Sequence, residues 1–206
     1  MSARLAVGVL ASGRGSNLQA LLEACAAPRF PARIAVVVSD REQALALERA
    51  AAAGVPAVWV NPKDFGDRAA WEAAVIAELR ERDVGLVCLA GFMRLLSPAF
   101  VRAFHGRILN IHPSLLPAFP GLHAQRQALD HGVKVAGATV HFVNEGLDSG
   151  PIVLQAAVAV EPGDTEDTLA ARILAEEHRL YPAAVRLFAE GRLEMAGRRV
   201  IVKEPQ

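Results

Sequence analysis

The sequence predicts an α/β fold: a single Rossmann-like domain with a mixed, mostly parallel sheet of about seven strands and helices on both faces. The chain has 206 residues, 52% of them hydrophobic, which is enough for one domain of this class with a substantial core. Short β-branched runs alternate with longer stretches of helical period, the pattern of parallel strands joined by crossover helices. Only about eight residues separate the last two strand-like runs, so we expect these two to pair antiparallel.

The predicted elements follow from local patterns in chain order. The strands are predicted at residues 5–11, 34–38, 57–60, 85–89, 107–112, 135–143 and 152–160. The first helices are predicted at residues 16–27 and 43–53, and a short one at residues 100–104. Each strand is a run of apolar, mostly β-branched residues, and each helix repeats its apolar residues every three or four positions.

Two further helices are predicted from their caps. One begins near Asp67 as its N-cap, and the last runs from the cap Asp164 to about residue 190 with a kink at Pro182. The apolar face of the first of these consists of Trp71, Val75 and Leu79. With no linker in the pattern, we expect one domain over residues 1–206, with an ordered body at about 4–195 and a short C-terminal tail.

Composition excludes several classes of function. The 22 Lys and Arg balance the 22 Asp and Glu, so no general attraction to nucleic acid or to an anionic membrane is expected. No apolar run reaches the roughly 20 residues of a membrane span. Cys25 and Cys88 provide neither a disulfide framework nor a metal-binding spacing. We therefore expect a cytoplasmic protein without a metal site.

A glycine-rich turn joins the first strand to the first helix at residues 12–17. A helix N-terminus offers unpaired N–H groups and a positive dipole end to a phosphate, and Gly15, Ser16 and Asn17 stand at that end. Leu18 occupies the place of the third glycine of a dinucleotide fingerprint, and no P-loop lysine follows. The alternatives left open are a site for a phosphorylated ligand that is not a dinucleotide and a tight structural turn.

The strand at residues 107–112 ends in a second candidate site. Asn110 and His112 are two residues apart and therefore face the same side of that strand, directly before Pro113. Ligands of open α/β sheets collect outside the carboxyl ends of strands, although a structural histidine is the alternative. Asp148, in the connection between the last two strands, is a turn former by itself. As a partner of His112 it would favour the protonated ring, which suits a general acid.

Glu177 falls inside the apolar arc of the last helix. The stripe that defines this arc is Leu169, Ile173, Leu180 and Leu187. A carboxylate among apolar residues needs a partner, either a neighbouring arginine or a cationic or amine ligand. His123 and His141 either line the same cleft or simply pack.

Several motifs together resemble the phosphoribosylglycinamide formyltransferase family of de novo purine synthesis. They are residues 110–123 (NIHPSLLPAFPGLH) with 127–129, residues 12–20, 89–98, 140–143 and 147–152, and Glu177-His178, in the order of the family and covering about residues 5–194. The resemblance implies transfer of a formyl group from 10-formyltetrahydrofolate to the amine of 5-phosphoribosylglycinamide. Asn110 would donate to the oxyanion, His112 would stabilise it and protonate the leaving nitrogen, and Asp148 would support His112 and help to move the proton of the amine.

The resemblance also implies the binding residues. Gly15, Ser16 and Asn17 would hold the ribose phosphate, and Glu177 would meet the amine end of that substrate. The folate site would be formed by Arg68 for an acidic tail, by Met93, Arg94, Leu95 and Leu96, and by Asn144 and Asp148. From the sequence alone, residues 93–96 would be interpreted as a piece of core, and this alternative stays open. Arg14 and Ala118 depart from the family pattern, and Arg14 is expected to strengthen phosphate binding.

Other readings remain. Formyltetrahydrofolate hydrolases share the Asn-x-His core, but we expect the length to leave no room for the added domains of deformylases or of methionyl-tRNA formyltransferases. A non-catalytic nucleotide-binding module would use the turn at residues 12–17 but leaves Asn110, His112 and Asp148 unexplained. The expected partners are small molecules, and the expected assembly is a monomer or a homodimer.

Overall fold

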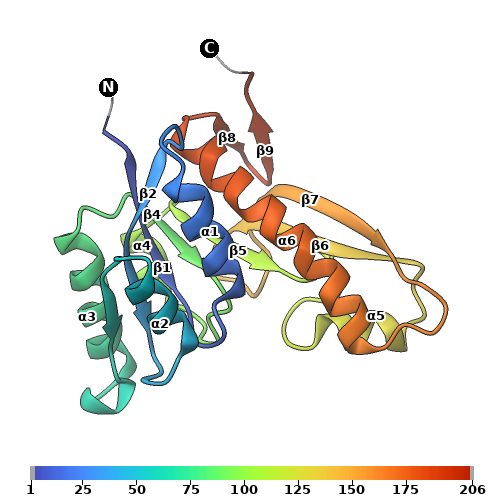
Figure 1. The fold of residues 1–206 in the computed structure, drawn as a ribbon, viewed down its shortest axis with the longest axis horizontal. Coiled ribbons are helices and arrows are strands. Elements are labelled where there is room, and N and C mark those ends of the chain that lie inside the picture. Colours follow the sequence, from blue (N-terminus) through green and yellow to red (C-terminus); the bar gives the residue numbers. More distant parts are fainter. Residues whose placement is uncertain (1–2, 205–206) are drawn as a thin grey trace. The chain divides into compact units, whose positions relative to one another are not determined.

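The computed structural model describes residues 3–204. Its strands hydrogen bond in the order β3-β2-β1-β4-β5-β6-β7-β9-β8 (Figure 1). The α/β class and the mixed, largely parallel sheet are confirmed, but the sheet has nine strands rather than about seven. The two additional strands, β8 (Leu193–Ala196) and β9 (Arg199–Val202), form an antiparallel hairpin where the sequence predicts a tail. Strands of four residues are too short to show a clear alternation.

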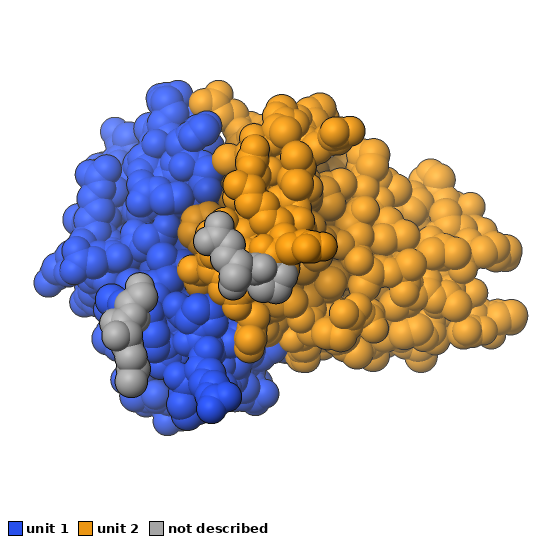
Figure 2. Space-filling view, turned by 90° about the horizontal axis from the view of Figure 1, so that it is seen from above, with its two compact units in different colours: residues 1–109 blue, residues 110–206 orange. Residues whose placement is uncertain are grey.

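The chain forms two compact units, the first ending at Leu109 and the second beginning at Asn110 (Figure 2). The first contains β1 (Leu5–Leu10), α1 (Ser16–Ala26), β2 (Ala32–Ser39), α2 (Leu45–Ala52), β3 (Ala57–Trp59), the 3₁₀ turn η1 (Pro62–Asp64), α3 (Arg68–Glu81), β4 (Leu86–Leu89) and α4 (Pro98–Ala103). The second contains α5 (Ala124–Asp130), β6 (Val135–Phe142), β7 (Ile152–Ala159), α6 (Glu166–Ala189), β8 and β9. Strand β5 (Ile108–His112) crosses the boundary.

In the first unit, β1 lies between β2 and β4 and pairs with both in parallel. The chain therefore moves outward through β2 and β3 and then returns to the other side of β1. Right-handed crossovers place α1 and α2 on one face and α3 and α4 on the other, and each pair of helices is in contact (Figure 1). The carboxyl ends of β1 and β4 meet at this reversal, which is where open α/β sheets bind ligands.

In the second unit, β6 and β7 form the predicted antiparallel pair, and α6 packs against both. On its other side, β7 pairs with β9 in parallel. α5 packs on α6, and the sequence did not predict this short helix. The buried face of α6 includes Leu169, Ile173 and Leu180 as expected, but Leu187 is only half-buried, and Tyr181, Ala184 and Val185 complete the face instead.

Two of the predicted helix ends can be checked at their caps. Asp67 is the N-cap of α3 and accepts a hydrogen bond of 2.8 Å from the backbone N–H of Ala70. Asp164 is not the cap of α6, because Thr165 takes that place. Asp164 instead accepts two hydrogen bonds from the guanidinium of Arg172, which hold the pKa of its carboxyl well below the usual range. Helix α6 continues through Pro182 to its end.

Candidate active site

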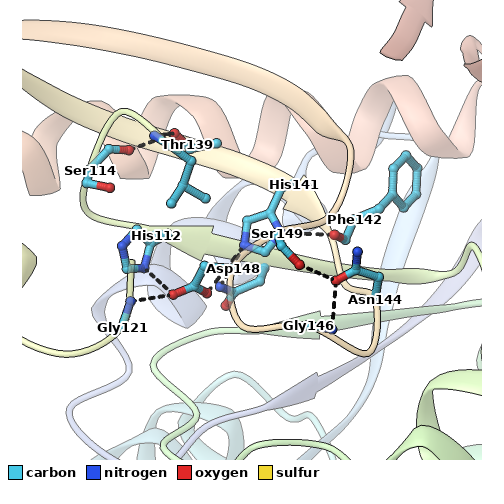
Figure 3. Close-up of polar contacts among 12 residues, drawn as sticks. His112, Ser114, Gly121, Thr139, His141, Phe142, Asn144, Gly146, Asp148 and Ser149 are labelled. Carbon is cyan, nitrogen blue, oxygen red and sulfur yellow. Dashed lines mark hydrogen bonds and ion pairs between the residues drawn. The ribbon is translucent and has the colours of Figure 1, made fainter. Parts of the chain in front are cut away.

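The predicted catalytic residues come together within the second unit. Figure 3 shows His112 and Asp148 facing each other. Asn110 and His112 lie on β5, and Asp148 lies in the β6–β7 connection with a φ of 44°. The carboxylate of Asp148 approaches His112, with 3.4 Å between Oδ2 and Nδ1. The same Oδ2 accepts a hydrogen bond of 2.8 Å from the backbone N–H of Gly121. The expected pairing of Asp148 with His112 is therefore present.

The other ring nitrogen of His112 is also engaged. Nε2 lies 2.9 Å from the backbone oxygen of Phe119. A carbonyl oxygen only accepts, so Nε2 carries a proton, and Nδ1 faces a carboxylate. A ring with both nitrogens facing oxygen acceptors is fully satisfied when it carries both protons. This geometry suits an imidazolium that can give up one of them.

His141, for which the sequence left two alternatives open, lies in this cluster and contacts Asn110. Nδ1 of His141 lies 2.9 Å from the backbone oxygen of Phe142 and therefore carries the proton. Burial lowers the pKa of His141, so the ring is neutral and its Nε2 is an acceptor. This Nε2 accepts a hydrogen bond of 3.1 Å from Nδ2 of Asn110 and lies 3.7 Å from Oδ1 of Asp148. The bond fixes the amide of Asn110 and leaves its second N–H available.

Buried hydrogen bonds hold the loop that follows β5. Oγ1 of Thr139 on β6 donates to the backbone oxygen of Ser114 at 2.6 Å and accepts from the backbone N–H of Leu116 at 3.1 Å. Oγ of Ser114 in turn donates to the backbone oxygen of Ala118 at 2.6 Å. These bonds place the carbonyl of Phe119 against His112. Ala118 itself is exposed.

The remaining candidates of the second unit are placed as follows. Glu177 is buried on α6, at 6% exposure, as its position in the apolar arc predicts. Asn144 is exposed, and its Oδ1 accepts from the backbone of Gly146 and from Oγ of Ser149, so this oxygen shapes the β6–β7 connection (Figure 3). His123 is exposed and starts α5 with a φ of 57°.

The glycine-rich turn lies in the first unit at the carboxyl end of β1. Gly15, with a φ of 70°, is the N-cap of α1, so Ser16 and Asn17 begin the helix rather than capping it with their side chains. A Cβ on Gly15 would lie 2.9 Å from Cα of Ala46 on α2, so only glycine fits there. A hollow of about 550 Å³ lies beside the turn and is lined by residues 12–14 and 41–45. Arg14 lines this hollow, which does not include residues 15–17.

The folate candidates of the first unit follow β4. Met93 and Leu95 are 57% and 67% exposed, so the interpretation of residues 93–96 as core is wrong. Arg68, at the start of α3, donates from Nη2 to the backbone oxygen of Leu95 and from Nε to Oε1 of Glu72 at 3.0 Å. Arg68 and this segment are therefore in direct contact.

Sequence reasoning missed Glu72 and Asp40 as parts of the candidate sites, and for His141 it left open whether the ring lines the cleft or packs. Glu72 had a detectable signal, since it stands three and seven residues before Val75 and Leu79 and so shares their apolar face. Asp40 directly follows β2 and pairs through Oδ2 with Nε of Arg94 at 2.8 Å. Among the described residues, no group of three His, Cys, Asp or Glu is arranged to hold a metal ion. Within residues 3–204, no helix combines the length and apolar composition of a membrane span.

Known proteins are similar to this chain in sequence and in fold. The curated phosphoribosylglycinamide formyltransferase of Escherichia coli (strain K12) is 48% identical over 187 residues, covering 91% of this chain and 88% of its own. The crystal structure of glycinamide ribonucleotide transformylase 1 from Symbiobacterium toebii superposes with a TM-score of 0.97 at 59% identity, covering 99% and 96% of the two chains.

Larger proteins contain the same domain. The trifunctional purine biosynthetic protein adenosine-3 of Drosophila pseudoobscura pseudoobscura is 50% identical over 192 residues, which are 92% of this chain but only 14% of that protein. This chain spans less than a fifth of the length of such trifunctional relatives. A profile of the formyl transferase family matches residues 5–185, which include the turn at residues 12–17, the Asn-x-His strand and Asp148. The chain therefore belongs to the formyl transferase family.

Proposed function

We propose that this chain transfers the formyl group of 10-formyltetrahydrofolate to the amine of 5-phosphoribosylglycinamide, a step of de novo purine synthesis. The observation that carries the proposal is the cluster of Asn110, His112 and Asp148, which contains an amide donor, a ring with both nitrogens engaged and a carboxylate. Acyl transfer between nitrogens needs these three groups, because charge develops on the formyl oxygen and protons must move between the two amines.

The reaction assigns a role to each group. The amine nitrogen bonds to the formyl carbon, and the electron pair of the carbonyl moves to its oxygen. Asn110 donates its remaining N–H to that oxygen, while His141 holds the amide in place. When the oxygen re-forms its double bond, the bond from carbon to the folate nitrogen breaks. One such donor is typically worth about 3–4 kcal/mol of barrier.

His112 and Asp148 account for the protons. The folate nitrogen takes a proton from the imidazolium of His112, which becomes neutral. The attacking amine gives up one proton, directly or through water, to the carboxylate of Asp148. The oxygen of Phe119 now accepts the Nε2 proton of His112, so the substrate must compete with this carbonyl for the proton. The ion pair of 3.4 Å with Asp148 keeps the ring oriented during this exchange.

Binding is proposed for the other candidates. Gly15, Ser16 and Asn17 present the N-terminus of α1 to the ribose phosphate, which is supported by their place at the start of that helix, after the left-handed cap residue Gly15. Glu177, which is buried on α6, meets the amine end of the phosphorylated substrate. The folate site takes Arg68, the segment Met93–Arg94–Leu95–Leu96, Asn144 and Asp148. We also propose one formyltransferase domain, supported by the family match across residues 5–185.

The test is an assay for tetrahydrofolate release with three acceptors: phosphoribosylglycinamide, a glycinamide without the ribose phosphate, and water alone. We expect release only with the first. Equal release in water would identify a formyltetrahydrofolate hydrolase instead, and no release with any acceptor would refute the formyl-transfer function.

Replacing His112 with Ala should lower kcat by at least about a hundredfold. Asp130→Asn, which changes an exposed carboxylate at the end of α5, serves as a control and should leave kcat unchanged. Near-normal turnover of the His112 variant would remove this residue from the mechanism.

A further inference from the structure

We propose that Asp40 and Glu72, two buried carboxylates of the first unit, are positioning residues that hold the segment of residues 91–97, and Arg68 with it, ready for the folate co-substrate. The inference rests on the proposed function, because that function makes the segment part of the folate site. It adds two residues that touch no substrate themselves and act through the groups that do.

The segment combines a fixed backbone with exposed apolar side chains. Met93 and Leu95 are more than half exposed, which costs free energy unless a ligand or partner covers them. The start of the segment is nevertheless tied to the end of β1. The backbone N–H of Met93 donates to Oγ of Ser12 at 3.0 Å, and the backbone N–H of Ser12 donates to the oxygen of Gly91 at 3.1 Å. A segment held rigidly in this way presents its backbone groups to a ligand at little entropic cost.

Asp40 holds the middle of the segment through Arg94. The side chain of Asp40 is only 5% exposed, and its Oδ2 accepts a hydrogen bond of 2.8 Å from Nε of Arg94. The guanidinium of Arg94 also lies over the ring of Trp71, 5.4 Å from the centroid, and Trp71 stacks on Phe92 at 6.3 Å. Arg94 is therefore fixed on two sides, by a charge from the end of β2 and by an aromatic ring on α3.

Glu72 holds the end of the segment and Arg68 at the same time. It is 2% exposed, and its Oε1 accepts from Nε of Arg68 at 3.0 Å and from the backbone N–H of Ser97 at 2.8 Å. Its Oε2 accepts from Oγ of Ser97. Arg68 then reaches the backbone oxygen of Leu95 with Nη2. One buried carboxylate thus orients the arginine proposed for the acidic tail and fixes the backbone beside it.

The buried carboxylate of Asp40 is not explained by a contribution to stability alone. Its Oδ1 is buried without a hydrogen-bond partner among residues 3–204, and an unsatisfied buried oxygen destabilises a fold. Asp40→Asn keeps an oxygen near Arg94 but removes the negative charge, so it weakens the hold on the guanidinium. A stabilising residue would lose stability in this variant, whereas a positioning residue would lose its hold on Arg94 at little cost in stability.

The experiment compares Asp40→Asn and Glu72→Gln with Glu78→Gln, a matched control on α3 whose carboxylate pairs with Arg82 four residues on, away from the segment. We expect the KM for 10-formyltetrahydrofolate to rise about tenfold in the first two, the scale of one lost charged hydrogen bond. The KM for phosphoribosylglycinamide should stay within about twofold in all three. Equal folate KM values for both variants and the control would overturn the proposal.

A second readout does not depend on turnover. Trp59→Phe leaves Trp71, which is 3% exposed, as the single tryptophan and so as a fluorescent reporter under Arg94 and beside Phe92. In this background, Asp40→Asn should increase quenching of Trp71 by acrylamide with an unchanged thermal midpoint. Unchanged quenching would refute the hold of Asp40 on the segment, and a lowered midpoint would identify Asp40 as merely structural.

Failure of the proposed function and failure of the positioning role give different results. If the unsubstituted protein releases no tetrahydrofolate, the proposed function fails, while quenching of Trp71 still decides whether Asp40 fixes the segment. If the unsubstituted protein turns over and both variants match it in folate KM, the proposed function stands and the positioning role is refuted.

Discussion

Thr139→Val tests the loop that carries the carbonyl of Phe119 to His112. Valine has nearly the shape of threonine, so the substitution removes one hydroxyl from a fully buried position on β6. That hydroxyl donates to the backbone oxygen of Ser114 at 2.6 Å and accepts from the backbone N–H of Leu116 at 3.1 Å. Without it, both backbone groups lose these bonds in a buried place.

The size of the effect follows from those two groups. A buried polar group left without its partner costs about 1–3 kcal/mol, so two of them cost about 2–4 kcal/mol after some relaxation of the loop. Nε2 of Gln155 also loses the hydroxyl oxygen, 3.0 Å away, but keeps the backbone oxygen of Leu116 at 2.9 Å. Thr139→Ser is the matched control, because it keeps the hydroxyl and loses one methyl group, worth about 1 kcal/mol.

Urea unfolding followed by circular dichroism measures both variants against the unsubstituted protein. We expect Thr139→Val to lower the free energy of unfolding by about 2–4 kcal/mol and to lower it more than Thr139→Ser does. A valine variant within about 0.5 kcal/mol of the unsubstituted protein would show that these hydrogen bonds do not hold the loop.

Three further substitutions test other parts of the structure. Gly15→Ala places a Cβ 2.9 Å from Cα of Ala46 on a left-handed residue, so urea unfolding should show a loss of at least about 1 kcal/mol, and equal stability would contradict the close packing of the turn. Asp67→Ala removes the cap bond to Ala70 and should cost about 1 kcal/mol by the same measurement, with no loss if the cap is unimportant. Burial lowers the pKa of His141 below 6.5, so as the pH falls through about 6.5 the unfolded chain takes up this proton first and the protein loses up to about 1.4 kcal/mol per pH unit. His141→Gln should lose less stability than the unsubstituted protein as the pH falls, because the glutamine takes up no proton. If the free energies of unfolding of the two proteins change in parallel between about pH 7.5 and 5.5, this prediction is contradicted.

Periodicity predicted most of the fold, because the strands and helices are long enough to repeat their patterns. The period-two rule also placed Asn110 and His112 together on β5, and both face the cluster that contains Asp148. The β8–β9 hairpin was beyond this kind of reasoning, since each of its strands has four residues. The cap of α6 was misplaced by one residue because Asp164 and Thr165 are both good caps. The carboxylate of Asp164 is instead bound by Arg172, nearly two helical turns inside α6, and by the backbone N–H of Glu161.

Side chains that act through a neighbour are harder to predict than those that carry chemistry. Glu72 lies on the apolar face of α3, just as Glu177 lies in the apolar arc of α6. Glu72 also stands four residues after Arg68, however, and this spacing suggests an ordinary surface ion pair. What distinguishes Glu72 is the backbone of Ser97, 25 residues further along the chain. No local pattern contains that partner.

The partner of His112 is hidden for a related reason. Nε2 of His112 faces a main-chain oxygen, and every residue of the loop offers one, so the identity of Phe119 carries no signal. Its selection depends on the hydroxyls of Thr139 and Ser114, which fix the loop at residues 114, 116 and 118. A sequence therefore shows which side chains can transfer a proton, whereas the acceptor that holds the proton before the substrate arrives is set by the path of the backbone.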